Sequence, residues 1–260
     1  MVVLHDSSSP RCGCLEDLEE TEYGIVDCLF LPHVLVIAPH PDDEILGVGG
    51  TIAKRAINGD NVYVCVVTKA GEPLFREELV EQARKECREA DKYLGVKETF
   101  FLDFPAVRLE EVPRYKLNDG LMQAVQKVKP DEVYIPHRGD MQLDHKMIVD
   151  AVMVALRPKY EHVIKRIYAY ETLSETGWDI PNTVNEFIPT VYEDISDTLD
   201  KKLEAMNIFQ SQLADFPAAR SLGAIEALAK YRGSTVNVMA AEAFSLIREI
   251  KEKWGCISFS

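Results

Sequence analysis

The sequence lacks a long apolar run and a basic stripe, and we expect no signal peptide. No stretch approaches the roughly 20 apolar residues of a transmembrane helix, so we expect no stable insertion into a membrane. Acidic residues outnumber basic ones by 43 to 29, and the net charge of −14 argues against nucleic-acid binding through phosphate contacts. The first 20 residues are polar and acidic, unlike a signal peptide. We therefore expect a cytoplasmic protein.

The six cysteines lack the spacing of a zinc site. One residue separates Cys12 from Cys14, a spacing that recurring zinc sites do not use, and no second pair follows at a suitable distance. Cys65 lies inside an apolar run and is expected to be buried. The other cysteines are Cys28, Cys87 and Cys256. We expect all six to be reduced thiols.

Short apolar runs alternate with helical patterns along most of the chain. The predicted strands are 34–38, 61–68, 98–104, 131–137 and 166–171. The predicted helices are 51–57, 75–94, 115–128, 147–158, 194–214 and 239–253. Strands that alternate with helices form right-handed βαβ units, so we expect an α/β fold with a mostly parallel sheet and helices on both faces. Ligands of such sheets bind beyond the carboxyl ends of the strands.

The first 33 residues differ in composition from the rest of the chain. A serine-rich start, ending in Pro10, precedes a cluster of acids between Glu16 and Glu22. We therefore expect residues 1–33 to be an irregular extension and residues 34–260 to be a single domain. With 47% hydrophobic residues, a chain of 260 residues can bury the core of such a domain.

A cluster of polar side chains follows the first predicted strand. Residues 39–44 read PHPDDE, and four of these side chains can bind a metal or transfer protons. Asp42 or Asp43 could instead cap the next helix, with Glu44 as a first-turn acid. Capping explains one or two acids, but it does not explain His40 beside them.

A second polar segment, residues 137–145, follows the fourth predicted strand and ends in Asp144-His145. Alone this pair is weak evidence, because Asp144 could be a helix N-cap. With the first cluster it completes a set of two histidines and one carboxylate, which suits zinc with one position open to water. Zinc lowers the pKa of such a water to roughly 7, and a spare carboxylate can carry its proton to a leaving nitrogen.

These motifs make the sequence similar to the PIG-L/LmbE-like zinc-dependent N-deacetylases. The main matching segments are 38–54, 66–72, 93–96 and 137–152. Supporting matches are 170–178, 194–205, 211–213, 219–221 and 231–244. The similarity spans roughly residues 34–250 and resembles the glycan and polysaccharide biosynthesis branch. It implies a Rossmann-like, lactate-dehydrogenase-like three-layer fold and a substrate in which N-acetylglucosamine is linked to another group.

The resemblance also implies roles for the motif residues. The metal ligands would be His40, Asp43 and His145. They would hold zinc, although the same ligands accept iron(II). Asp42 would be the general base, and Asp144 would orient a ligand imidazole. 

One position departs from the family pattern. Many members carry a histidine where this chain has Gln142, which can donate a hydrogen bond to an oxyanion but cannot deliver a proton. Either Asp42 acts as base and then as acid while Gln142 and zinc polarise the carbonyl, or activity is weak or the substrate differs. The first alternative is favoured, because polar residues at this position resemble the glycan-pathway branch.

Several other residues are weaker candidates for substrate binding. Arg84 and Asp103 could contact the sugar, although a surface charge and a turn residue are the plain alternatives. Trp178 could stack on a sugar ring, but it suits the core or a lid better. Close packing of a helix on a strand is the role expected for Gly47, Gly49 and Gly50. Their spacing is not that of a dinucleotide-binding loop.

Several functions compete. The histidines and Asp42 could form the facial triad of a non-haem iron oxygenase, which usually needs an all-β barrel. A non-catalytic or altered-specificity relative could keep the metal or act on a non-sugar amide, but a structural metal needs no spare Asp42. A nucleotide-binding oxidoreductase would not need the metal cluster. We expect a zinc-dependent hydrolase that removes an acetyl or acyl group from the nitrogen of a small-molecule amino sugar; a homo-oligomer is compatible with the sequence.

Overall fold

The computed structural model describes residues 18–20, 26–28, 31–159 and 162–251. The chain divides into two units, Met1–Leu31 and Pro32–Ser260. In the first unit, β1 (Leu18–Glu20) pairs antiparallel with β2 (Val26–Cys28). The division into an extension over 1–33 and one domain over 34–260 stays a prediction. Cys12, Cys14 and Cys256 lie outside the described residues.

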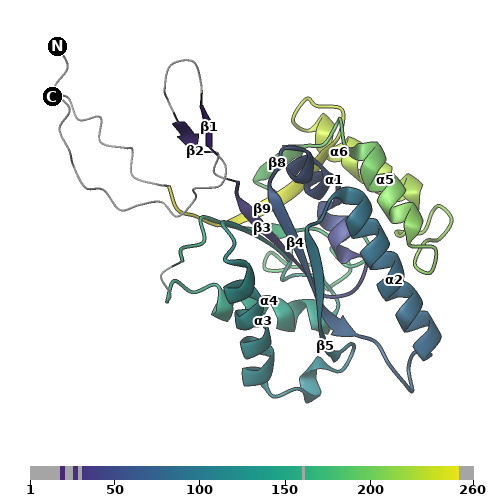
Figure 1. The fold of residues 1–260 in the computed structure, drawn as a ribbon. Helices are drawn as coiled ribbons and strands as arrows, with labels where there is room; N and C mark the ends of the chain where they lie inside the picture. Colours follow the sequence, from purple (N-terminus) through teal and green to yellow (C-terminus); the bar gives the residue numbers. More distant parts are fainter. Residues whose placement is uncertain (1–17, 21–25, 29–30, 160–161, 252–260) are drawn as a thin grey trace, which may run out of the picture. The chain divides into compact units, whose positions relative to one another are not determined.

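The second unit is built around a mixed seven-stranded sheet (Figure 1). Its strands are β3 (His33–Ala38), β4 (Asn61–Lys69), β5 (Glu98–Pro105), β6 (Glu132–Pro136), β7 (Arg166–Tyr170), β8 (Val191–Asp194) and β9 (Ala241–Glu249). Their order in the sheet is β5-β4-β3-β6-β7-β9-β8. The first five in this order pair in parallel, whereas β9 runs antiparallel to both β7 and β8. The five strands predicted from apolar runs are confirmed.

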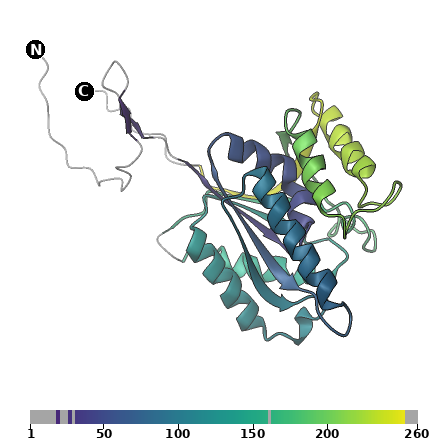
Figure 2. The same cartoon turned by 45° about the vertical axis from the view of Figure 1, so that its right-hand side comes forward.

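Helices cover both faces of this sheet (Figures 1 and 2). On one face lie α1 (Asp43–Ile57), α2 (Glu77–Leu94), α5 (Leu199–Ile208) and α6 (Leu222–Ser234). On the other face lie α3 (Arg114–Val128) and α4 (Leu143–Ala155), with the short 3-10 turn η1 (Leu109–Glu111) beside α4. None of these described helices combines the length and apolar character that a membrane span requires.

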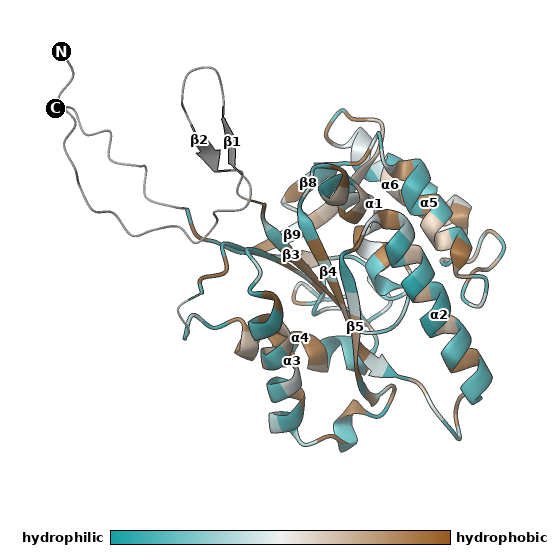
Figure 3. Cartoon of the chain, in the orientation of Figure 1, coloured by the Kyte–Doolittle hydropathy of each residue, from teal (hydrophilic) through white to brown (hydrophobic). Residues whose placement is uncertain are grey.

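The central strand β3 shows why its sequence is apolar without interruption. Val34 and Val36 join the core under α1 and α2, while Leu35 and Ile37 join the core under α3 and α4. Alternate residues of a strand point to opposite faces, so a strand covered on both sides needs apolar residues at every position. Figure 3 shows the same division, with hydrophobic central strands and hydrophilic outer helix faces.

The glycines of the first motif lie inside a helix. We predicted a helix that begins at residue 51, but α1 begins at Asp43. A Cβ at Gly47 would lie 2.2 Å from Cδ2 of Tyr170 in β7, and one at Gly50 would lie 2.8 Å from Cδ1 of Ile195. The close packing of a helix on a strand expected from these glycines is therefore confirmed at Gly47, whereas Gly50 packs against a residue that follows β8.

Of the two helices predicted near the end of the chain, the one over 239–253 was wrong and the one over 194–214 was too long. Residues 239–253 contain strand β9, and residues 194–214 contain only the end of β8, a turn and the short helix α5. Glu242 in β9 is buried, where it accepts hydrogen bonds from the backbone N–H of Gly50 and of Thr51 and from Lys202 Nζ. The helix-forming composition of β9 is overridden by these tertiary contacts. Strand β8 and helix α6 were not predicted.

Candidate active site

The PHPDDE motif forms a tight turn between β3 and α1, at the carboxyl end of the parallel strands. The carbonyl oxygen of Pro39 accepts hydrogen bonds from Thr68 N at 3.1 Å and Thr68 Oγ1 at 2.7 Å, which hold the turn against β4. Asp42 has φ 113°, a conformation that aspartate adopts more readily than most residues. Asp42 is the N-cap residue of α1 and Glu44 lies in its first turn, as the capping alternative expected, but the Asp42 side chain makes no capping hydrogen bond. Capping therefore gives no role to the Asp42 carboxylate.

His40, Asp43 and His145 come together beyond the ends of β3 and β6. Asp43 Oδ2 lies 3.2 Å from His40 Nδ1 and 3.3 Å from His145 Nε2. In tetrahedral zinc sites with bonds of about 2.0–2.1 Å, neighbouring ligand atoms lie ~3.3 Å apart. His145 Nε2 and Asp43 Oδ1 are buried and have no hydrogen-bond partner among the described residues. Both the spacing and the unpaired atoms fit a metal ion held between the three side chains.

Asp144 contacts the imidazole of His40 on the side away from this cluster. Asp144 Oδ2 lies 3.1 Å from His40 Nε2 and accepts a hydrogen bond from the backbone N–H of Val107 at 2.7 Å. A carboxylate at this nitrogen favours the tautomer that leaves Nδ1 free for a metal. Asp144 is not the N-cap of α4, because the N-cap residue is Gln142.

Asp140 makes the corresponding contact with the other imidazole. Asp140 Oδ2 lies 2.8 Å from His145 Nδ1, and both side chains are fully buried. Asp140 Oδ1 accepts a hydrogen bond from the hydroxyl of Thr176 at 2.6 Å. Each histidine of the cluster thus has an outer carboxylate of its own.

Burial and neighbouring charges act in opposite directions on the pKa values of the three cluster residues. Burial alone would raise the pKa of Asp43, but His145 and His40 outweigh it and hold that pKa well below its ordinary value. Burial would lower the pKa of His40, but Asp144 and Asp43 raise it to about 9. The pKa of His145 rises to about 10, because Asp43 and Asp140 outweigh its burial. Asp43 is therefore ionised, as a metal ligand must be.

Asp42 is a spare carboxylate beside the cluster. Its Oδ2 atom is buried, has no hydrogen-bond partner in the described part of the chain and lies 3.2 Å from Arg220 Nε. Burial raises the pKa of Asp42 to about 7, although Arg220 acts to lower it. A carboxyl group that titrates near neutrality can both accept and release a proton. Arg220 comes from the loop between α5 and α6, which is tied to α2 where Glu86 accepts the backbone N–H of Ser211 at 3.2 Å.

A cleft of about 370 Å³ opens beside the cluster. Its charged and polar lining includes His40, Asp42, Lys69, Arg84, Gln142 and Arg220. Gln142 Oε1 is buried and makes no hydrogen bond with the described residues. The side-chain amide of Gln142 is therefore available to a bound molecule in this cleft.

Of the two predicted substrate-binding residues, the structure brings one to the cleft. Arg84 lines it, with its guanidinium 4.2 Å from the centre of the Phe101 ring. Asp103 is 55% exposed and does not line the cleft, but it accepts a hydrogen bond from Arg84 Nη1 at 2.7 Å. Asp103 can orient Arg84 from behind. Trp178 is 67% exposed, so neither the core role nor a place in this cleft applies to it.

A second group of metal-binding residue types lies under the motif. Cys87 Sγ is 3.5 Å from Glu44 Oε1 and 3.8 Å from Asp91 Oδ2, and all three residues are buried. Burial raises the pKa of Glu44 well above its ordinary value, and it raises the pKa of Asp91 to about 7. Asp91 also accepts a hydrogen bond from Thr99 Oγ1 at 2.6 Å. These raised pKa values favour neutral carboxylic acids rather than ligand carboxylates.

Replacing Asp91 with asparagine should stabilise the protein more at high pH than at low pH. An aspartate in the unfolded chain has a pKa near 3.9, so between that value and the folded pKa of about 7 the unfolded state binds fewer protons. The stabilisation that the neutral Asp91 carboxyl gives the folded state is complete below this pH window and is lost as the pH rises through it. Between about pH 5.5 and about pH 8, the unfolding free energy of Asp91→Asn relative to the unmodified protein should rise by about 2 kcal/mol.

Urea unfolding at the two pH values measures this difference. Asp119→Asn is the matched control, because Asp119 is exposed on α3 and its replacement should leave the pH dependence unchanged. Equal pH dependence in Asp91→Asn and the unmodified protein would show that the Asp91 carboxyl is not held neutral by burial.

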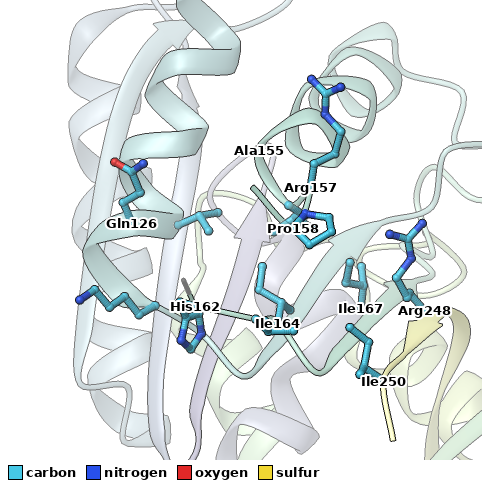
Figure 4. Close-up of a pocket in the computed structure, with 13 residues that line it drawn as sticks. Gln126, Ala155, Arg157, Pro158, His162, Ile164, Ile167, Arg248 and Ile250 are labelled. Carbon is cyan, nitrogen blue, oxygen red and sulfur yellow. The ribbon is translucent and has the colours of Figure 1, made fainter. Parts of the chain in front are cut away.

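A larger cavity, of about 440 Å³, lies at the other end of the sheet (Figure 4). It is bordered by the last turns of α3 and α4, the start of β7 and the end of β9. Its lining includes Gln126, His162, Ile164, Ile167 and Ile250. None of the cluster residues lines this cavity, so the smaller cleft is the candidate active site.

Three side chains of the site had no role assigned from sequence: Asp140, Thr176 and Arg220. Each lies in a segment that contributes to the family resemblance, 137–152, 170–178 or 219–221. That resemblance was the available signal. The resemblance indicates which segments contribute to the site, but not which side chains contact each other. Asp140 contacts Thr176, and Arg220 contacts Asp42, only because folding brings their loops together.

Comparison with known proteins places this site in a family. The profile described as PIG-L, GlcNAc-PI de-N-acetylase, matches residues 35–156. A probable N-acetyl-alpha-D-glucosaminyl L-malate deacetylase 2 of Bacillus cereus is 30% identical over 192 residues, which cover 69% of this chain and 83% of that protein. 

Solved structures share the fold. N,N'-diacetylchitobiose deacetylase from Pyrococcus horikoshii is similar with a TM-score of 0.66 and 25% identity, covering 83% of this chain and 84% of that chain. The 4-carboxy-2-hydroxymuconate hydratase GalB from Pseudomonas putida is similar with a TM-score of 0.67, covering 86% and 100%, but at 20% identity it shows the fold alone. The chain therefore belongs to the PIG-L family of N-deacetylases, hydrolases that act on amide bonds.

Proposed function

We propose that the protein is a zinc-dependent deacetylase that removes the acetyl group from the nitrogen of N-acetylglucosamine linked to a second group. The observation that carries this proposal is the position of Asp42, a buried carboxylate left outside the three-residue cluster and lining the same cleft as His40. A site that only stored or structurally bound a metal would not need it.

The proposed zinc ligands are His40 through Nδ1, Asp43 through Oδ2 and His145 through Nε2. Support comes from the spacing of these atoms and from the carboxylates on the outer nitrogens of both rings. A zinc ion held there would act as a Lewis acid and would lower the pKa of a water molecule to about 7.

Asp42 would accept a proton from the attacking water and would then deliver it to the leaving nitrogen. Its raised pKa supports both steps near neutral pH. Arg220 would stabilise the ionised form of Asp42 between these steps. The Gln142 amide would donate a hydrogen bond to the oxygen on which negative charge develops, which is the contribution left to a residue that cannot deliver a proton.

The cleft supports a substrate the size of one amino sugar with a linked group. Its volume of about 370 Å³ lies within the roughly 300–1,000 Å³ of small-molecule sites. Arg84, oriented by Asp103, would contact substrate oxygens away from the reacting amide. The Rossmann-like, lactate-dehydrogenase-like arrangement is part of this proposal, supported by five parallel strands between two helical layers.

A non-haem iron oxygenase is not supported, because the two histidines lie on a sheet with helices on both faces rather than in an all-β barrel. The non-catalytic alternative is instead an outcome of the activity test. Both alternatives predict no amine release from amide substrates, so a single assay separates them from deacetylation.

Amine release from N-acetylglucosaminyl malate and from diacetylchitobiose tests the proposal. Metal-free protein should release little amine, added zinc should restore release, and a chelator should abolish it again. No release from either substrate by protein that binds zinc stoichiometrically would contradict the proposed reaction with these sugars. Gln142→His would then show whether the missing family histidine accounts for the inactivity.

A further inference from the structure

A continuous chain of partly or fully buried hydrogen bonds runs from the turn after β7 to the imidazole of His145. The backbone N–H of Thr172 donates to Thr176 Oγ1 at 2.8 Å, and the Thr176 hydroxyl donates to Asp140 Oδ1 at 2.6 Å. The other oxygen of Asp140 lies 2.8 Å from His145 Nδ1. Thr172, Asp140 and His145 are fully buried, and Thr176 is partly buried.

The direction of each hydrogen bond in this chain is fixed. A threonine hydroxyl has one proton, and Thr176 accepts a hydrogen bond from a backbone N–H that can only donate. Its own proton is therefore free to point at Asp140. Asp140 Oδ2 in turn accepts from His145 Nδ1–H, so Nε2, which faces Asp43, is the nitrogen of this ring left to bind a metal.

The turn that carries Thr176 is itself held by backbone hydrogen bonds. The backbone N–H groups of Glu175 and Thr176 donate to the carbonyl oxygen of Thr172 at 2.8 and 2.7 Å. The backbone N–H of Met141 donates to the carbonyl oxygen of Glu175 at 3.3 Å, which joins this turn to the loop that carries Asp140. The hydroxyl is thus delivered from the end of β7 to a loop that follows β6.

We propose that Asp140 and Thr176 are positioning residues that hold the His145 imidazole for metal binding, and that the Thr176 hydroxyl sets the metal affinity of the protein. Without this hydroxyl, Asp140 Oδ1 would be buried with no hydrogen-bond partner among the described residues, and the carboxylate would be free to turn away from His145. The outer carboxylate of His40 has no such dependence, because Asp144 is held by the backbone N–H of Val107.

Two substitutions of Thr176 and one of Thr172 test this role. Thr176→Val removes the hydroxyl with little change in shape, and Thr176→Ser keeps it. Thr172→Val is the matched control in the same turn, because the buried Thr172 hydroxyl makes no hydrogen bond with the described residues. Zinc affinity is measured by competition with a chromogenic chelator, and the visible spectrum of the cobalt(II)-loaded protein reports the ligand geometry.

The Thr176→Val variant should bind zinc about 10-fold more weakly and should show an altered cobalt(II) spectrum, as expected for loss of an outer partner of a ligand. Thr176→Ser and Thr172→Val should each stay within about 3-fold of the unmodified protein. Unchanged zinc affinity in Thr176→Val, or an equal loss in Thr172→Val, would overturn the proposal.

A folding defect in Thr176→Val would be detected by circular dichroism of the metal-free protein. In that case Asp140→Asn tests the proposal instead, because this variant keeps the size of the side chain but changes the group that faces His145 Nδ1. Unchanged zinc affinity in Asp140→Asn would overturn the proposal. The inference rests on the proposed metal centre. If the unmodified protein binds no zinc, the metal centre fails, whereas zinc binding that ignores Thr176 defeats the positioning role alone.

Discussion

Replacing Asp42 with asparagine is expected to lower turnover by about 1,000-fold while leaving metal binding intact. Proton transfer by a positioned side chain contributes about 10²–10⁴-fold to rate, and asparagine can neither accept nor deliver the proton. Asparagine keeps the size of the side chain and adopts positive φ readily, so it suits the φ of 113° at this position better than alanine does. The loss therefore reports chemistry rather than a rearranged turn.

Two measurements on the same preparation, kcat and the zinc content of the protein, separate these effects. Asp43→Asn is the matched control, because it changes the next residue of the same motif in the same way but removes a cluster carboxylate. We expect Asp42→Asn to keep its zinc and lose turnover, and Asp43→Asn to lose both. Near-normal kcat in zinc-loaded Asp42→Asn would rule out Asp42 as the general base.

The strands that could be predicted are those in the middle of the sheet, where helices cover both faces. Strands such as β3 are buried on both faces, so an unbroken apolar run follows directly from their position in the sheet. The edge of the sheet beyond β7 does not follow this rule. β8 is short, and β9 carries the buried Glu242, whose partners on α1 and α5 are distant in sequence.

The same distinction applies to the candidate site. The cluster could be predicted because its members lie in two short motifs, each placed directly after a strand that ends at the same edge of the sheet. The ion pair of Arg220 with Asp42 could not be predicted, because the loop between α5 and α6 has no periodic pattern that fixes where its side chains point. The role of Gln142 is likewise set by an unpaired amide in the cleft, which a sequence does not reveal.

Replacing His145 with alanine should weaken metal binding strongly. Four-ligand zinc sites bind with about 10–16 kcal/mol, so the loss of one protein ligand should cost about 3 kcal/mol, or roughly 100-fold or more in affinity. The change would also leave Asp140 buried without its imidazole partner. His162→Ala is the control, because His162 lines the other cavity, where its Nε2 lies 2.7 Å from the carbonyl oxygen of Pro130.

Zinc content after gel filtration and thermal unfolding with added zinc give two independent readouts of this change. A ligand that binds only the folded state stabilises it by about 2.7 kcal/mol at 100 times its Kd. Zinc should therefore raise the unfolding temperature of the unmodified protein and of His162→Ala, but not that of His145→Ala. If zinc stabilises all three proteins equally, the ion binds elsewhere, and Asp42 then has no metal-activated water from which to take a proton.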